Sequence, residues 1–326
     1  MGAGIDRVWK LHGDGRTVEP GAVVRPDERL NTPRMLGLGG QHVLAMFGAT
    51  ALIPVLTGFP VTTTIFFSGV GAILFNLVTR NKVPSYTGSS AAFVAPVVAA
   101  KSEGMAAALC GIAAAGIALL LIGLLVDRAG YRIIEFLLPP VVTGTIVALI
   151  GLNLAPIAEE QFTQQAGIAL VTLASILIIG VAVKNYLSRL SVFLGVVVGY
   201  VFAALLGDVN WDAVHAAAWF GLPDFTTPEF NVRAILLIVP SVLLVLLAEN
   251  AGHVKAVATM TERDLDPYLG RSFMGDGVAT TLAGLFGGSG TTTYAENIGV
   301  MGYTRIYSTL AYLIAGVVAI RYASVE

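Results

Sequence analysis

The chain alternates long apolar runs with short polar segments, which is the pattern of a protein that crosses a membrane many times. An apolar run of about 20 residues spans the hydrocarbon core of a bilayer. Runs near that length lie at 37–57, 61–79, 104–126, 133–154, 166–183, 190–207, 232–254, 272–288 and 305–322. Two further apolar segments, 88–100 and 290–302, are short and rich in glycine, serine and threonine. We expect both to be half-helical crossings, which brings the predicted total to eleven spans.

The distribution of positive charge supports this count. With the N-terminus inside, the predicted outer side carries only Lys101, Arg233 and Arg321, and the predicted cytoplasmic side carries the rest of the 19 Lys and Arg residues. This is the positive-inside bias of membrane proteins, and it is lost if either short segment is not a crossing. We therefore predict a multi-pass protein of the cytoplasmic (inner) membrane with its N-terminus inside. Residues 1–36 are expected to form a flexible cytoplasmic tail.

Composition narrows the class of protein further. Hydrophobic residues make up 56% of the 326 residues and charged residues 12%, too little charge to cover a soluble protein of this size. The sequence shows no phosphate-binding loop, no metal-ligand spacing and no nucleophile–base set, so we do not expect an enzyme. A single cysteine, Cys110, excludes an internal disulfide.

The two halves of the chain repeat one arrangement. In the first half, a full span containing Gln41 and His42 is followed, one span later, by the short segment 88–100. In the second half, a full span containing Glu249 is followed, one span later, by the short segment 290–302. Seven crossings separate the partners, and an odd number gives the two copies inverted topology. Interrupted segments at matching places in two halves indicate the midplane substrate site of a secondary transporter.

The physics of a broken helix explains why such segments bind ligands. A helix that ends at membrane depth leaves backbone N–H groups without intrahelical acceptors. That is tolerated only where the backbone is buried in protein or lines a cavity. The free amides and the positive end of the helix dipole then face a ligand oxygen, with Ser90 and Thr293 available as caps.

Ionisable side chains in these apolar segments are the candidate functional groups. A carboxylate at membrane depth costs about 2.5–3.5 kcal/mol on insertion scales, which makes Glu249 and Glu296 candidates for a substrate site. His253 follows Glu249 by one helical turn, so the two share a face and can exchange a proton. Asp276 is expected near the cytoplasmic end of its span, either in ion coupling or as a hydrogen-bonded gate residue.

Three stretches of the chain resemble the nucleobase–ascorbate transporter family, which includes the bacterial xanthine and uracil permeases. The stretches read QHVLAMFGATALIPVLTG, VPSYTGSSAAFVAP and TTTYAENIGVMGYTRIYS. The resemblance extends from about residue 37 to the end and is strongest to the uracil/pyrimidine branch. Uracil permeases have glutamate at the first position of the signature, where purine-directed members usually have glutamine, and this chain has Glu296 there.

The resemblance implies an all-α polytopic fold of fourteen spans in two inverted repeats of seven. A core domain moves against a gate domain, and brief extended stretches in the broken spans 3 and 10 pair beside the substrate. The implied division of this chain is a tail at 1–36, core spans 1–4 at 37–126, the first half of the gate at 127–207, an outer loop at 208–231 and core spans 8–11 at 232–326. Spans 12–14 have no counterpart, so we expect a piece of a longer chain, truncated after about span 11.

The resemblance also assigns roles at the site. Uracil offers two N–H donors and two carbonyl acceptors, so Glu249 and Glu296 are expected to accept from the base. Backbone amides at Ala91 and Ala295 are expected to donate to it, although relatives often have an aromatic residue at the position of Ala91. The remaining assignments are stacking or packing for Tyr294 and Phe93, proton coupling for His253, Glu249 and Asp276, and support by His42, Gln41, Asn297, Ser90 and Thr293.

The predicted function is import of uracil or a related pyrimidine by secondary active transport with protons. Na⁺ remains an alternative coupling ion, and no other cofactor and no metal is expected. The alternatives are a xanthine or urate permease of the same family, an anion transporter of similar fold, and a nucleobase-binding membrane protein that does not transport. The expected partners are the nucleobase and the lipid bilayer; a homodimer is left open, and no nucleic acid is expected.

Overall fold

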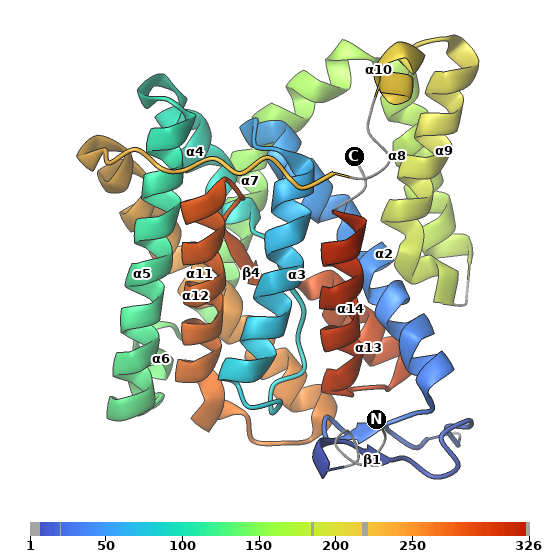
Figure 1. Cartoon of the computed structure of the whole chain (residues 1–326), viewed down its shortest axis with the longest axis vertical. Coiled ribbons are helices and arrows are strands. Elements are labelled where there is room, and N and C mark those ends of the chain that lie inside the picture. The colour runs from blue at the N-terminus through green and yellow to red at the C-terminus, as the bar shows by residue number, and fades with distance from the viewer. Residues whose placement is uncertain (1–6, 20, 184–185, 217–220, 324–326) are drawn as a thin grey trace.

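The computed structural model describes residues 7–19, 21–183, 186–216 and 221–323, and it is a bundle of helices (Figure 1). The long helices are α2 (Thr32–Thr57), α3 (Val61–Val78), α5 (Met105–Ala129), α7 (Pro140–Gln164), α11 (Val232–Thr261) and α12 (Leu269–Phe286). The shorter ones are α4 (Val94–Ala100), α6 (Arg132–Leu137), α8 (Ala166–Ala182), α9 (Ser191–Leu206), α10 (Trp211–Ala216), α13 (Ala295–Thr304) and α14 (Thr309–Tyr322). Within the described ranges, α2, α3, α5, α7 and α11 are long and apolar enough to cross a membrane, and α8, α9 and α14 are apolar but shorter.

The two short segments are broken by extended backbone, as the sequence predicts. Strand β3 (Thr87–Ser89) precedes a 3-10 turn at Ala91–Phe93 and helix α4, and strand β4 (Thr291–Thr293) precedes α13. The strands pair antiparallel in the middle of the bundle, with Thr87 opposite Thr293 and Ser89 opposite Thr291. All six strand residues are buried, so the interrupted backbone satisfies its hydrogen bonds inside the protein.

A seam of small residues joins α5 and α12 along their length. A Cβ atom at Gly277 would lie 2.5 Å from the backbone nitrogen of Leu120, and one at Gly284 would lie 2.5 Å from that of Ala113. Backbones approach this closely only where glycine replaces larger side chains. Helix α12 is less hydrophobic than its neighbours, but its small and polar residues face α3 and α5 inside the bundle.

The predicted span 133–154 is wrong in its boundaries. The chain forms the short helix α6, breaks after Leu137, and restarts as α7 at Pro140, which continues to Gln164. Pro139 and Pro140 cause the break, because proline cannot donate a backbone hydrogen bond and excludes the residue before it from a helix. Helices α8 and α9 pack on each other and stand to one side of the bundle (Figure 1).

Residues 221–230 run across one end of the bundle as an extended strap. The Thr63 hydroxyl donates to the Asp224 carbonyl at 2.8 Å, and Glu229 N–H donates to the Ala106 carbonyl at 3.0 Å. Phe225 packs edge-to-face on Phe66. The strap thus holds the ends of α3 and α5 together.

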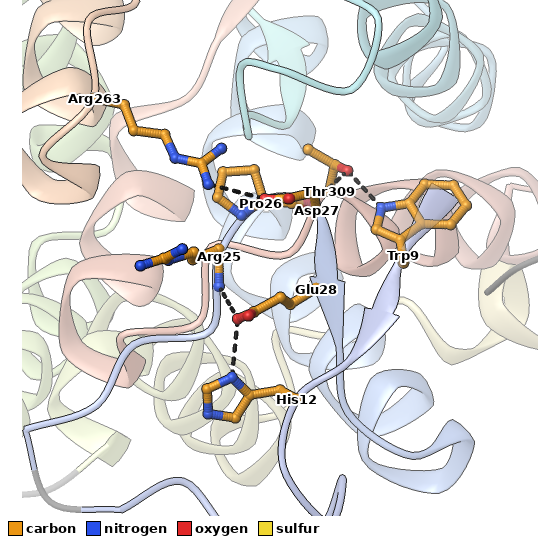
Figure 2. A network of polar contacts seen from close by, with 8 residues as sticks. All are labelled: Trp9, His12, Arg25, Pro26, Asp27, Glu28, Arg263 and Thr309. Carbon is orange, nitrogen blue, oxygen red and sulfur yellow. Dashed lines mark hydrogen bonds and ion pairs between the residues drawn. The ribbon is translucent and has the colours of Figure 1, made fainter. Parts of the chain in front are cut away.

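The expectation of a flexible N-terminal tail is wrong, because the described residues before α2 are folded. Strands β1 (Lys10–Leu11) and β2 (Glu28–Arg29) pair in parallel. Trp9, Val24 and Leu30 are buried, and Val24 and Leu30 join a small hydrophobic cluster with Ala311 of α14. Figure 2 shows the polar contacts of this segment with the rest of the bundle. Few apolar residues are needed because the segment packs on an existing surface and does not build a core of its own.

Candidate functional site

The candidate site surrounds the paired strands β3 and β4. Pairing continues past the strands, since Ser90 N–H donates to the Gly290 carbonyl at 2.9 Å and Tyr294 N–H donates to the Tyr86 carbonyl at 3.0 Å. The short helices α4 and α13 therefore start close to each other and on opposite strands. Their N-terminal ends are the broken-helix ends that the sequence predicts.

Glu249 of α11 lies beside the start of the first broken segment. The Ser90 hydroxyl donates to Glu249 Oε2 at 3.2 Å and also accepts from the Ala92 N–H at 3.2 Å. The same Ser90 hydroxyl therefore both caps the 3-10 turn and orients the Glu249 carboxylate. Glu249 is half-buried, as is Ala91, which follows Ser90 and begins the 3-10 turn.

Glu296 lies in the first turn of α13, where a negative charge is favoured by the helix dipole. The cap residue Tyr294 supplies no side-chain hydrogen bond to this turn. Ala295 and Glu296 are both exposed, whereas Asn297 and Ile298 are buried. The exposed end of α13 thus presents a carboxylate together with backbone N–H donors.

His253 contacts β4 through its ring. Its Nδ1 atom lies 2.9 Å from the Thr293 hydroxyl, one turn along α11 from Glu249. On the helix face that His253 shares with Glu249, the His253 ring is therefore hydrogen-bonded to Thr293 of the second broken segment. The predicted direct exchange of a proton between Glu249 and His253 stays a prediction.

Asp276 lies deeper in the bundle than the sequence suggests. It is fully buried, and its Oδ2 atom accepts hydrogen bonds from the Thr293 N–H at 3.3 Å and from the Asn250 amide. The expected position near the cytoplasmic end of α12 is wrong, because this contact places Asp276 at the level of the strands. Asn250 was missed by the sequence reasoning; its place directly after Glu249, as a polar residue in an apolar helix, was the available signal.

The two aromatic candidates are packed within the protein. The Tyr294 hydroxyl donates to the Ser89 carbonyl at 2.7 Å and accepts from the Thr50 hydroxyl at 3.0 Å. Phe93 is fully buried, with its ring against Gly290. Of the two roles left open by the sequence, stacking and packing, these contacts favour packing for both residues.

The supporting residues connect α13 to α2. The Asn297 amide donates to the His42 carbonyl at 3.0 Å and lies 3.1 Å from His42 Nδ1. Both side chains are buried, and the His42 ring packs on Tyr312 of α14 at 4.5 Å between ring centroids. Gln41 is half-buried on the same helix.

Two cavities lie between α11 and the α6–α7 segment, on either side of Glu249 along α11. One, of about 340 Å³, is lined by Ala91, Ala95 and Asn153, and by Ser241 and Val245 of α11. The other, of about 640 Å³, is lined by Leu138 and Thr143, and by Ala251, Gly252 and Lys255 of α11. Glu249 therefore lies between the two cavities along the sequence of α11.

This arrangement suits a neutral, polar ligand. It offers carboxylates and hydroxyls as acceptors and the backbone amides at the helix ends as donors. In the part of the chain that the structure describes, no three His, Cys, Asp or Glu side chains gather as metal ligands.

Comparison with known proteins gives consistent results. A family model described as "Permease family", for xanthine and uracil permeases, matches residues 34–325. The "Putative pyrimidine permease RutG" of Escherichia coli is 46% identical over 328 residues, which cover 95% of this chain and 73% of that protein. The uracil permease of Bacillus caldolyticus is 40% identical over 316 residues, which cover 91% of this chain and 73% of that protein.

A solved structure shares the fold at low sequence identity. The transmembrane domain of the cyanobacterial bicarbonate transporter BicA superposes with a TM-score of 0.67 at 15% identity, covering 89% of this chain and 82% of that domain. This likeness and the apolar helices show an all-helical membrane transporter fold. The chain is therefore an integral membrane protein that belongs to the xanthine/uracil permease family.

Proposed function

We propose that the protein is a secondary active transporter that imports uracil or a related pyrimidine across the cytoplasmic membrane, with its N-terminus inside. The observation that carries this proposal is the meeting of Glu249 with the broken segments, through Ser90 Oγ at 3.2 Å. A pyrimidine bound there would donate its ring N–H groups to Glu249 and Glu296. Its carbonyl oxygens would accept from backbone amides at Ala91 and Ala295.

The substrate class follows from the acceptors. Carboxylates accept hydrogen bonds and, when ionised, cannot donate them, so a site with Glu249 and Glu296 favours a ligand that presents N–H groups. An anionic substrate would be repelled by the same pair. The names of the relatives, a pyrimidine permease and a uracil permease, agree with this choice.

The transport step is proposed to be alternating access between a core and a gate. Strands β3 and β4 are tied by hydrogen bonds to α2, α3, α11 and α12, which supports a core that carries the site as one body. Helices α6–α9 would form the part of the gate present in this chain. The two cavities between α7 and α11 support access to Glu249 from either side. The antiparallel pairing of the two broken segments supports inverted repeats.

Proton coupling is proposed to use Glu249 and His253, with Asp276 behind them. His253 links α11 to β4 through its hydrogen bond with Thr293. A change in the protonation of His253 would therefore alter this hydrogen bond and the position of β4 beside the substrate. Asp276 and Asn250 connect the same strand to α12.

The test is binding and transport of radiolabelled uracil by the purified chain. Saturable binding in detergent, with xanthine as competitor, would establish the pyrimidine site if xanthine does not displace uracil. In proteoliposomes, we expect an imposed pH gradient to drive uptake and a Na⁺ gradient at equal pH to drive none. Displacement of uracil by xanthine would refute the pyrimidine assignment, and uptake driven by Na⁺ alone would refute proton coupling.

A further inference from the structure

The N-terminal residues 7–31 form a structure of their own, which we call the N-terminal clasp (residues 7–19 and 21–31 are described). It precedes residue 34, where the match to the family model begins. The clasp is closed by the β1–β2 pair and by a hydrogen-bond contact between His12 Nδ1 and Glu28 Oε2 at 2.9 Å. Figure 2 shows that its side chains reach outward to other parts of the bundle.

One set of contacts holds the link between α13 and α14. Val24 N–H donates to the Arg305 carbonyl at 3.0 Å, and Tyr307 N–H donates to the Val24 carbonyl at 2.8 Å. The Thr309 hydroxyl donates to the Pro26 carbonyl at 3.0 Å and accepts from Trp9 Nε1 at 2.8 Å. Trp9, Val24 and Thr309 are buried, so these bonds are shielded from water.

A second contact holds the end of α11. Arg263 follows the last turn of that helix, and its Nη2 atom lies 2.9 Å from Asp27 Oδ1 (Figure 2). Asp27 is next to Pro26 in the chain, so one short stretch of the clasp binds both the end of α11 and the start of α14. Met260 of α11 also lies against Gly302 of α13.

These contacts reach the two helices that carry the candidate carboxylates. Glu249 lies on α11 and Glu296 on α13. Helix α13 has ten residues, too few to be stable without tertiary contacts, and it is anchored by β4 at one end and by the clasp at the other. Arg305, at the clasp end, adopts a left-handed backbone conformation with φ of 55°. That conformation is costly for arginine, and the bonds to Val24 hold it.

We infer that Asp27 and Trp9 are positioning residues, which fix α11 relative to α13 and thereby set the spacing of Glu249 and Glu296. The clasp joins the C-terminal ends of α11 and α13, near Arg263 and Arg305, which are 42 residues apart in the sequence. This inference rests on the proposed function only for its effect on substrate binding. The positioning itself is a property of the fold.

The test compares Asp27→Asn and Trp9→Phe with the control Glu19→Gln, which changes an exposed acid of the clasp. Each purified variant is assayed for the Kd of radiolabelled uracil, thermal stability, and hydrogen exchange of peptides covering 296–309. We expect the two clasp variants to weaken uracil binding by about three- to tenfold, which lies within the range for residues that modulate a site without touching it. Exchange at 296–309 should rise, and the control should match the wild type in both measurements.

A charge swap separates positioning from a general loss of stability. Asp27→Arg combined with Arg263→Asp should restore the Kd and the exchange, whereas either single change should not. Wild-type Kd and exchange in both Asp27→Asn and Trp9→Phe would overturn the inference, as would loss of thermal stability with an unchanged Kd. If the wild type binds no uracil, the proposed function fails, and the exchange at 296–309 alone decides whether the clasp positions α13.

Discussion

Replacing Glu249 with glutamine tests the substrate site while keeping the size of the side chain. One carboxylate oxygen, Oε2, is held by the Ser90 hydroxyl at 3.2 Å, which leaves Oε1 to accept from a bound pyrimidine. A hydrogen bond to a charged group contributes about 1.5–3 kcal/mol. At 1.4 kcal/mol per tenfold change in Kd, the loss corresponds to a weakening of about 10- to 150-fold. Glutamine also turns an N–H donor toward the donors of the base, so we expect the upper part of this range.

The assay for Glu249→Gln is equilibrium binding of radiolabelled uracil in detergent. Glu160→Gln, at an exposed position of α7, is the matched control and should leave the Kd unchanged. Ser90→Ala removes the cap and the orienting bond but leaves the charge, so it should weaken binding less than Glu249→Gln does. A Kd for Glu249→Gln within twofold of the wild type would refute a role for this carboxylate in binding the substrate.

Three further perturbations test the strand pair, the coupling residue and the clasp. Gly88→Ala places a Cβ atom 2.6 Å from Tyr294 Cζ, and overpacking of about 1–3 kcal/mol should lower the thermal midpoint; Gly299→Ala, with open space around it, should not. His253→Leu should impair pH-driven uptake more than equilibrium binding, and an equal loss of both would contradict a coupling role. Partial burial raises the pKa of Asp27, but its hydrogen bonds and its paired guanidinium lower it further, so the net pKa lies below the usual value. The stability from this pair is present above the ordinary Asp pKa of about 3.9 and is lost as the pH falls through the lower folded value. The difference in thermal midpoint between wild type and Asp27→Asn should therefore shrink in acid, and a constant difference would contradict it.

The positions of the broken segments were predictable because their composition is unusual. Glycine, serine and threonine occupy every position of 87–90 and 288–293, within otherwise apolar surroundings. The paired strands were implied by the family resemblance, and their burial satisfies the freed backbone groups. The proline pair at 139–140 carried an equally clear signal for the break between α6 and α7.

The contacts that sequence reasoning missed depend on residues far apart in the chain. Trp9 donates a hydrogen bond to Thr309, which is 300 residues away in the sequence. The polar N-terminal segment has no periodic pattern that predicts this contact. Asn250 and Asp276 lie on different helices, and only their packing makes them neighbours. Glu249 and Glu296 could be chosen as candidates from the cost of a charge in apolar surroundings, whereas the packed state of Tyr294 required the structure.

The glycine seam between α5 and α12 bears on how substrate preference can be changed in this protein. Because added side chains at Gly277 or Gly284 would collide with backbone atoms 2.5 Å away, no rotamer change relieves the clash. Helix α12 in turn fixes β4 through Thr280, whose hydroxyl donates to the Thr291 carbonyl at 3.0 Å. In a library of variants designed to bind a new nucleobase, most variants that alter the seam would therefore fail to fold, and their specificity could not be measured. Diversity is better placed at Ala91, Ala95 and Asn153, which line a cavity and leave the seam intact.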